Sequence, residues 1–374
     1  MIGFNKPYLT GNELIFIQEA ATKKQLAGDG IYTAKCSEWL ENEISCYKAL
    51  LTHSCTAALE MAAILADIQE GDEVIMPSFT FVSTANAFVL RGATPVFVDV
   101  RKDTLNINEQ LIEDAITKHT KAIVPVHYAG VPCEMDTIME IARRHNLLVI
   151  EDAAQGILSS YKGRPLGSIG DIGCLSFHET KNIISGEGGA LLLNNDLFSR
   201  RAQIIREKGT NRAEFMSGEV SKYSWVDIGS SFLPGEMTAA FLWAQLQEGK
   251  YITKKRKKIW NFYHQAFQDL ENAQQIKRPS IPEASVHNGH IYYLLLNTND
   301  LRDNFIEAMS SQGVQCVFHY VPLHSSKIGK KIGRISGDMS ITEDIASRLV
   351  RLPLWLGVDA KRVIECVNIS ILES

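Results

Sequence analysis

The sequence predicts an α/β protein with a mostly parallel central sheet and a smaller C-terminal α+β domain. From residue 73, strand-like and helix-like stretches alternate, which is typical of βαβ units. Two apolar stretches, 172–177 and 190–193, flank a glycine-rich turn and read as neighbouring buried strands. In the last third of the chain the alternation becomes irregular. We therefore expect a large α/β domain over 1–250 and a small domain over 251–374.

Composition limits the possible function classes. The 374 residues are 45% hydrophobic and 22% charged, as in an ordinary globular protein, and the net charge of -5 argues against nucleic-acid binding. Seven scattered cysteines without CxxC pairs indicate a reducing compartment and no zinc site. The N-terminus does not resemble a signal peptide, and no apolar stretch reaches the roughly 20 residues needed to span a bilayer. We expect a cytoplasmic protein that binds no membrane and no metal.

The N-terminal part predicts a phosphate site. A helix over 11–26 and a second helix capped by Thr33 precede a short strand at Leu50-Leu51 and a buried helix over 57–66. The junction before that last helix offers hydroxyls and free backbone N–H groups to an anion. The residues of this junction are Ser54, Cys55 and Thr56. The alternative is an ordinary Ser/Thr N-cap without a ligand.

The alternating part places aromatic side chains at the ligand-binding edge of the sheet. The expected strands are 73–76, 94–98, 121–126 and 147–151, and the expected helices are 84–91, 108–116 and 135–145. Phe79 and Phe81 follow the first of these strands, where an aromatic ring can stack on a flat ligand or simply pack in the core.

A lysine and an aspartate follow two buried strands. Lys181 comes after the stretch 172–177, and a poorly solvated lysine has a lowered pKa and can form a Schiff base with a carbonyl. Asp152 ends the strand over 147–151, at the carboxyl edge of the sheet. This pair is what pyridoxal phosphate needs: the lysine binds its aldehyde carbon and the aspartate keeps its ring nitrogen protonated. A purely structural lysine is the alternative.

The C-terminal part predicts the small domain. After an apolar helix over 239–247, the charge run 254–258 reads as a solvated helix face. Strands over 290–296 and 314–319 flank a helix over 301–312, and a last helix covers 342–350.

Three stretches carry a family resemblance. They are Asp152-Ala-Ala-Gln155, Ser176-Phe-His-Glu-Thr-Lys181 and Gly186-Glu-Gly-Gly189. Together they resemble the DegT/DnrJ/StrS sugar aminotransferases, and the resemblance covers essentially the whole chain. It implies the type I fold of pyridoxal-phosphate-dependent transferases, similar to aspartate aminotransferase.

The resemblance also implies roles for individual residues. Lys181 and Asp152 would be catalytic and would hold the cofactor. Further cofactor contacts would come from Gln155 at the ring hydroxyl, Phe81 stacked on the ring, and a phosphate site of Ser54, Cys55, Thr56, Ser176 and Ser231. Ser231, where many members have asparagine, would reach the cofactor of the neighbouring subunit in a homodimer. Substrate contacts would come from His319, Tyr320 and His324. A histidine similar to His127 lies near the cofactor in the family, although a core histidine is an equal alternative.

The implied reaction is an amino transfer from L-glutamate to a nucleotide-linked sugar. The expected acceptor is dTDP-4-keto-6-deoxyglucose, aminated at C4 to dTDP-4-amino-4,6-dideoxygalactose for a surface polysaccharide such as O-antigen or enterobacterial common antigen. The equatorial product, dTDP-4-amino-4,6-dideoxyglucose, is the alternative within the family.

Other classes of function fit the residues less well. Sugar dehydratases of this family carry histidine in place of the lysine, and a non-catalytic binding protein does not need the set Asp152, Gln155 and Lys181. A metal-dependent hydrolase using His319 and His324 lacks an H-E-x-x-H motif. For the assembly, the alternative to a dimer is a monomer whose own Arg206, Lys208 or Arg212 closes the phosphate site.

Overall fold

The central sheet of the computed structural model contains eight strands among residues 1–373, which are the residues that the structure describes. Five neighbouring strand pairs run parallel, whereas β9 runs antiparallel to both of its neighbours. This confirms the predicted α/β class. Across the sheet the order is β1 (Lys48–Thr52), β9 (Gly189–Leu193), β8 (Ile172–Ser176), β5 (Leu148–Asp152), β4 (Thr120–Ile123), β2 (Glu73–Pro77), β3 (Thr94–Val98) and β13 (Arg334–Ile335).

Helices cover both faces of this sheet, because alternate residues of a strand point to opposite sides. On β5, Val149 belongs to one buried cluster and Ile150 to the other. The Val149 cluster takes in α2 (Ile31–Ile44), α6 (Met135–His145) and α9 (Glu236–Gln247). The Ile150 cluster takes in α3 (Cys55–Leu65), α4 (Val82–Val89) and α7 (Ser199–Arg206). Since both faces are covered, strands such as β8 and β9 are apolar and buried along their whole length.

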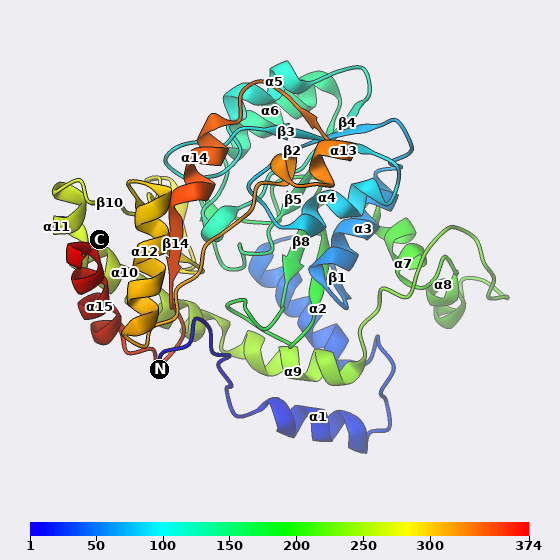
Figure 1. Ribbon diagram of the computed structural model, residues 1–374. Coiled ribbons are helices and arrows are strands. Elements are labelled where there is room, and N and C mark those ends of the chain that lie inside the picture. The colour runs from blue at the N-terminus through cyan, green and yellow to red at the C-terminus, as the bar shows by residue number, and fades with distance from the viewer. Residues whose placement is uncertain (374) are drawn as a thin grey trace.

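A second, antiparallel sheet forms the predicted smaller α+β part. Its strands, in order, are β10 (Ile276–Lys277), β12 (Tyr292–Leu296) and β14 (Leu349–Leu352). It shares a core with α10 (Gly249–Ala266), α12 (Asn299–Ser311) and α15 (Ala360–Glu373). Figure 1 shows these elements at one side of the molecule, where the N-terminus and the C-terminal end also lie.

The chain crosses between the two parts more than once. β13 returns to the edge of the large sheet beside β3, and Ile2 pairs with Val314. A third small sheet joins β11 (Ser285–Val286) to β6 (Ser160–Tyr161) and β7 (Arg164–Pro165). The division of the chain near residue 250 therefore stays a prediction.

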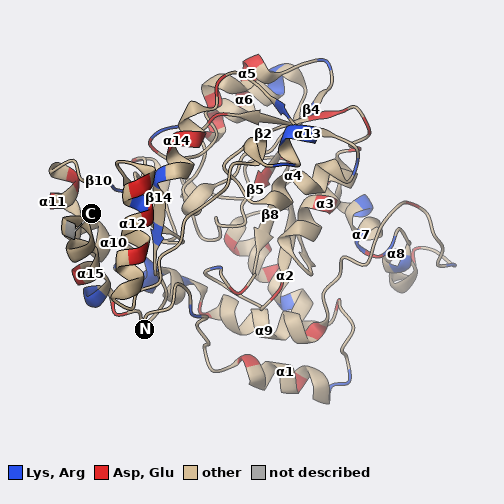
Figure 2. Cartoon of the chain, in the orientation of Figure 1, with Lys and Arg blue, Asp and Glu red and all other residues tan. Residues whose placement is uncertain are grey.

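The remaining elements connect these layers. The helices are α1 (Glu13–Thr22), α5 (Ile112–Ala115), α8 (Arg212–Ser217), α11 (Gln268–Asn272), α13 (Gly329–Ile332) and α14 (Ser340–Arg348). The 3-10 turns are η1 (Glu109–Leu111), η2 (Tyr128–Gly130) and η3 (Leu323–Ser325). Basic and acidic residues are interspersed along the helices (Figure 2). Over residues 1–373, no helix has the length and apolar character of a membrane span.

Three local predictions are wrong. The helix expected over 342–350 ends at Arg348, because the apolar run that follows pairs with β12 as strand β14. The strand expected over 314–319 forms only isolated bridges, and α15 was not expected at all. The helix expected over 108–116 divides into η1 and α5.

The predicted cap of α2 is also wrong. Thr33 lies inside this helix rather than at its start, and its hydroxyl donates to Glu236 of α9. The same carboxylate accepts from the backbone N–H groups of Gly30, Tyr32 and Thr33. The N-terminus of α2 is thus capped from a distant helix, which no local pattern can predict.

Candidate active site

A cavity of about 660 Å³ lies at the carboxyl edge of the large sheet, where it meets the second sheet. Ligand pockets of open α/β sheets are found at this edge. Ten of the twelve predicted site residues line it: Ser54, Cys55, Thr56, Phe81, Asp152, Gln155, Ser176, Lys181, His319 and Tyr320.

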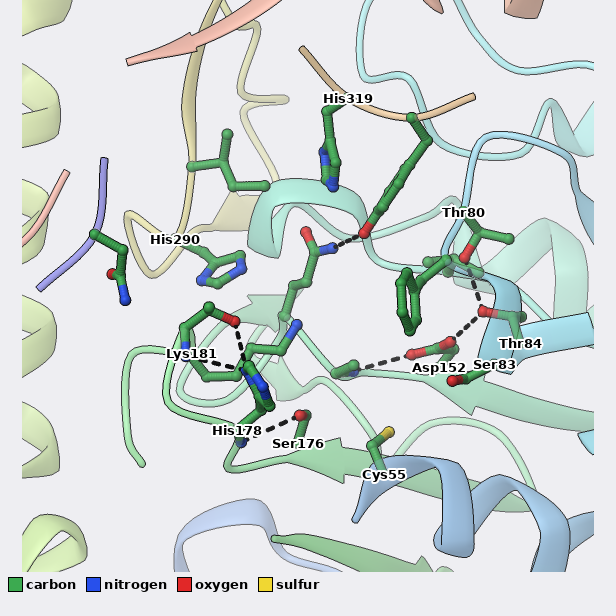
Figure 3. Close-up of a pocket in the computed structure, with 18 of the residues that line it drawn as sticks. Cys55, Thr80, Ser83, Thr84, Asp152, Ser176, His178, Lys181, His290 and His319 are labelled. Atoms are coloured by element: carbon green, nitrogen blue, oxygen red, sulfur yellow. Dashed lines mark hydrogen bonds between the residues drawn. The ribbon is translucent and has the colours of Figure 1, made fainter. Parts of the chain in front are cut away.

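Lys181 enters the cavity from the loop after β8. Its side chain is half-buried and lies near His178 and Ser176 in Figure 3. The ammonium group makes no hydrogen bond within the described chain. Burial lowers the pKa of Lys181 from its usual value, while Cys55 and Asp152 oppose this change and Arg351 adds to it. At a given pH, Lys181 is therefore more often an uncharged, nucleophilic amine than a fully solvated lysine is.

Asp152 is fixed at the end of β5. One carboxylate oxygen accepts from the Thr84 hydroxyl at 2.7 Å and the other from the backbone N–H of Ala154 at 3.2 Å. Thr84 is itself hydrogen-bonded to Thr80 at 2.8 Å, as the dashed lines in Figure 3 show. Because β5 and β8 are neighbours in the sheet, the carboxylate and the amine face the same cavity.

The residues of the predicted anion site lie at the N-terminus of α3 and line the cavity. Ser54 is the N-cap, and its hydroxyl accepts from the backbone N–H of Ala57 at 3.1 Å. Ser54 therefore caps the helix and also lines the cavity. The backbone N–H groups of Cys55 and Thr56 have no acceptor among the described residues. They are free to bind an anion at the positive end of the helix.

The glycine run after Lys181 lets β9 approach the N-terminus of α3. A Cβ atom on Gly189 would lie 2.4 Å from the carbonyl carbon of Ser54 and 2.5 Å from the nitrogen of Cys55. Such distances exclude any larger residue unless the backbone moves. The predicted motif therefore has a packing role at the N-terminus of α3.

The two phenylalanines that follow β2, Phe79 and Phe81, lie in different environments. Phe81 is 57% exposed, lines the cavity and lies near Tyr320. Phe79 is fully buried and packs against Tyr128 instead. Of these two phenylalanines, only Phe81 is thus available to a ligand.

Gln155 links the two sides of the cavity. Its side-chain oxygen accepts from Ala129 at 2.7 Å, and its nitrogen donates to the Tyr320 hydroxyl at 3.2 Å. His319 lies beside Tyr320 and is hydrogen-bonded to the Tyr128 hydroxyl. Burial and the cations Arg351 and Lys181 hold the pKa of His319 well below its usual value.

Two predicted residues lie away from the cavity. Ser231 is exposed and pairs with Glu207, and His324 is buried between Ser78 at 2.7 Å and Glu343 at 3.2 Å. His127 takes the alternative interpretation: it is fully buried in the core and bonded to Glu151 at 2.8 Å.

The basic residues considered for closing a monomeric site do not line the cavity either. Arg206 pairs with Asp29, and Arg212 pairs with Glu207. Lys208 is exposed at a turn.

Sequence reasoning missed several lining residues, above all Arg256, His290 and Arg351. Arg256 belongs to the charge run 254–258, for which the sequence predicts a solvated helix face. Its spacing of four from Ile252 and from Trp260 places it on the buried side of α10, a signal that could have found it. Arg351 is a lone cation within an apolar run, and this is also a signal that could have found it.

The cavity fits pyridoxal phosphate. It offers an amine of lowered pKa for the aldehyde, a fixed carboxylate for the ring nitrogen, an open aromatic face and a helix N-terminus with two free N–H groups. Its volume is also in the range of cofactor sites.

Comparisons with known proteins agree with this geometry. The profile of the DegT/DnrJ/EryC1/StrS aminotransferase family matches residues 8–369. The chain is 38% identical to the uncharacterized protein MJ1066 of Methanocaldococcus jannaschii, over 91% of this chain and 89% of that protein. It is 34% identical to the spore coat polysaccharide biosynthesis protein SpsC of Bacillus subtilis, over 86% and 84% of the two chains.

A solved structure extends this similarity to the whole fold. The aminotransferase from Psychrobacter cryohalolentis is 27% identical and superposes with a TM-score of 0.91 over 99% of both chains. The chain therefore belongs to the DegT/DnrJ/EryC1/StrS aminotransferase family, and it is a pyridoxal-phosphate-dependent aminotransferase.

Proposed function

We propose that the enzyme transfers the amino group of L-glutamate to C4 of dTDP-4-keto-6-deoxyglucose, giving dTDP-4-amino-4,6-dideoxygalactose. The observation that carries the proposal is the meeting of Lys181 and Asp152 in one cavity, at the ends of neighbouring strands of an aminotransferase chain. The name of the 34% identical relative, a polysaccharide biosynthesis protein, supports a sugar acceptor.

Lys181 and Asp152 would do the chemical work. When bound, pyridoxal phosphate supplies an aldehyde that takes up the amino nitrogen and a ring that takes up electrons. Lys181 would carry a proton from the α-carbon of the donor to the C4′ carbon of the cofactor and, in the second half of the reaction, from C4′ to C4 of the sugar. Its lowered pKa suits this role, since only the neutral amine accepts a proton. Asp152, held by Thr84, balances the charge on the ring nitrogen.

The remaining predicted residues would orient the cofactor. Gln155 donates to the ring hydroxyl, and Phe81 stacks on the ring. The phosphate, with about two negative charges, binds the hydroxyls and N–H groups of Ser54, Cys55, Thr56 and Ser176. His319 and Tyr320 would contact the substrate from the second sheet.

We also propose a homodimer in which each subunit completes the other's site. No lysine or arginine belongs to the phosphate cradle, and the segment with Ser231 lies outside its own cavity. That segment is contiguous with exposed aromatic residues such as Trp225, which is 79% exposed. A partner subunit would cover these residues and bring Ser231 to the cofactor. Closed two-fold dimers are the commonest such assembly.

Product analysis tests the function. The holoenzyme is incubated with dTDP-4-keto-6-deoxyglucose and L-glutamate, and the sugar product is characterised by NMR. We expect an axial amine at C4. An equatorial amine would assign the 4-amino-4,6-dideoxyglucose product instead, and an unreacted sugar would overturn the proposed acceptor.

A further inference from the structure

Cations without an acidic partner line the side of the cavity formed by the second sheet. The acidic residues of the lining are Asp152, which Thr84 holds, and Glu187, which lies at 3.6 Å from His178. No carboxylate comes within ion-pair distance of Arg256 or Arg351 among residues 1–373. A buried cation without a counter-ion is costly, so this wall is suited to an anion.

Arg256 and Arg351 differ in how many donors they have left. Arg256 donates to the carbonyl oxygens of Gly289 at 3.1 Å and of His290 at 2.8 Å, and it thereby holds the loop before β12. The side chain of Arg351 makes no hydrogen bond in the described chain, and its buried Nε has no acceptor. The full planar set of donors of Arg351 is therefore available to a carboxylate or phosphate.

The N-terminal segment holds this guanidinium in place. The Cζ atom of Arg351 lies 4.7 Å from the centroid of the Phe4 ring. Phe4 is anchored through its backbone N–H to the Gln315 side chain at 3.1 Å, and the carbonyl of Gly3 accepts from Trp355 at 3.0 Å. On the other side, Asn5 donates to the carbonyl of Glu179, in the loop that carries Lys181, at 3.4 Å.

The position of Arg351 decides which anion it binds. Arg351 and Lys181 line the same cavity, and the charge of Arg351 contributes to the lowered pKa of Lys181. In an amino acid donor, the carboxylate is attached to the carbon whose nitrogen replaces that of Lys181. In a nucleotide sugar, by contrast, the sugar ring separates the diphosphate from the reacting C4. The donor carboxylate is therefore the anion that must lie beside Lys181.

We propose that Arg351 binds the α-carboxylate of the amino donor, with Phe4 as the positioning residue that fixes its guanidinium. This inference rests on the proposed function for its donor class, an amino acid. It adds a substrate contact and assigns the N-terminal segment a part in donor recognition.

Binding to the holoenzyme tests the proposal. The probes are 2-oxoglutarate, for the donor, and dTDP, for the acceptor, each titrated by calorimetry. R351Q should weaken 2-oxoglutarate binding by about 10- to 100-fold, the effect of losing charge-assisted hydrogen bonds, and leave dTDP binding unchanged. R351K keeps the charge but loses the planar set of donors, so it should weaken 2-oxoglutarate binding less than R351Q does. F4L should also weaken this binding less. R362Q makes the same change at an exposed arginine of α15 and should match the parent.

Kinetics separate positioning from folding. With retained cofactor absorbance, F4L should raise the KM for L-glutamate more than it lowers kcat, and it should leave the sugar half-reaction unchanged. Unchanged 2-oxoglutarate binding in R351Q would overturn the inference, as would a loss of dTDP binding alone, which would assign Arg351 to the diphosphate. A parent enzyme that binds 2-oxoglutarate but aminates no sugar would overturn the proposed function only.

Discussion

At the scale of single residues, the reaction depends on the amine of Lys181. Lys181→Ala should fold normally, because the side chain lies at a cavity edge, but it should lose transamination and the near-violet absorbance of the lysine-bound cofactor. General acid–base catalysis contributes about 10²–10⁴-fold, so turnover should fall at least that far. Steady-state assays and absorbance spectra measure both effects. Lys254→Ala, an exposed site on α10, is the control, and parent-like turnover in Lys181→Ala would refute the assignment.

Asp152→Asn should separate binding from chemistry. The amide keeps the shape of the side chain but cannot balance a protonated ring nitrogen. Because that charge matters most in the transition state, kcat should fall by about 10²–10³-fold while KM changes little. An unchanged kcat would mean that another acid faces the ring nitrogen.

The lowered pKa of Lys181 predicts how fast the cofactor-free protein takes up pyridoxal phosphate. Only the neutral amine reacts, so the rate should rise with pH through the folded-state pKa and then level off. Since burial lowers that pKa, the midpoint of this rise should lie below about 10.4, the value of an ordinary lysine. Stopped-flow absorbance measures the rate. A midpoint at or above pH 10.4 would contradict the lowered pKa of this amine.

At the scale of elements, the junction between α2 and α9 depends on Glu236. Its buried carboxylate caps three backbone N–H groups at the start of α2. Glu236→Ala should lower the free energy of unfolding by about 1–3 kcal/mol for each N–H left without an acceptor, although such terms are not fully additive. Urea unfolding measures the loss. Glu38→Gln, at an exposed position of α2, should change the free energy of unfolding little. An equally small change in Glu236→Ala would contradict the capping role.

The elements also explain which features the sequence could predict. Lys181 and Asp152 follow buried apolar strands, and the carboxyl ends of parallel strands share one edge, so local patterns bring the two together. Arg351 escaped prediction because the run around it looked helical, and only pairing with β12 makes it a strand. Arg256 was hidden in a charge run whose other members face solvent or lie half-buried. Contacts set by tertiary pairing, such as Glu236 with α2, leave no local signature.

At the scale of the whole molecule, the segment around Trp225 and Ser231 predicts the assembly. If this segment completes a neighbour's site, light scattering on the holoenzyme at micromolar concentration should give about twice the chain mass of 41.6 kDa. Trp225→Glu should then weaken both the dimer and cofactor retention, because a charge is costly in a buried interface. A fully active particle near 41.6 kDa would refute the shared site.

Covalent trapping shows directly whether Lys181 binds the cofactor within this cavity. Borohydride reduction of the holoenzyme fixes pyridoxal phosphate to the lysine that carries it, and peptide mapping by mass spectrometry identifies the residue. We expect one modified peptide, with the label on Lys181, and no label on that peptide in Lys181→Ala. A label on any other lysine in the parent enzyme, with Lys181 unmodified, would contradict it.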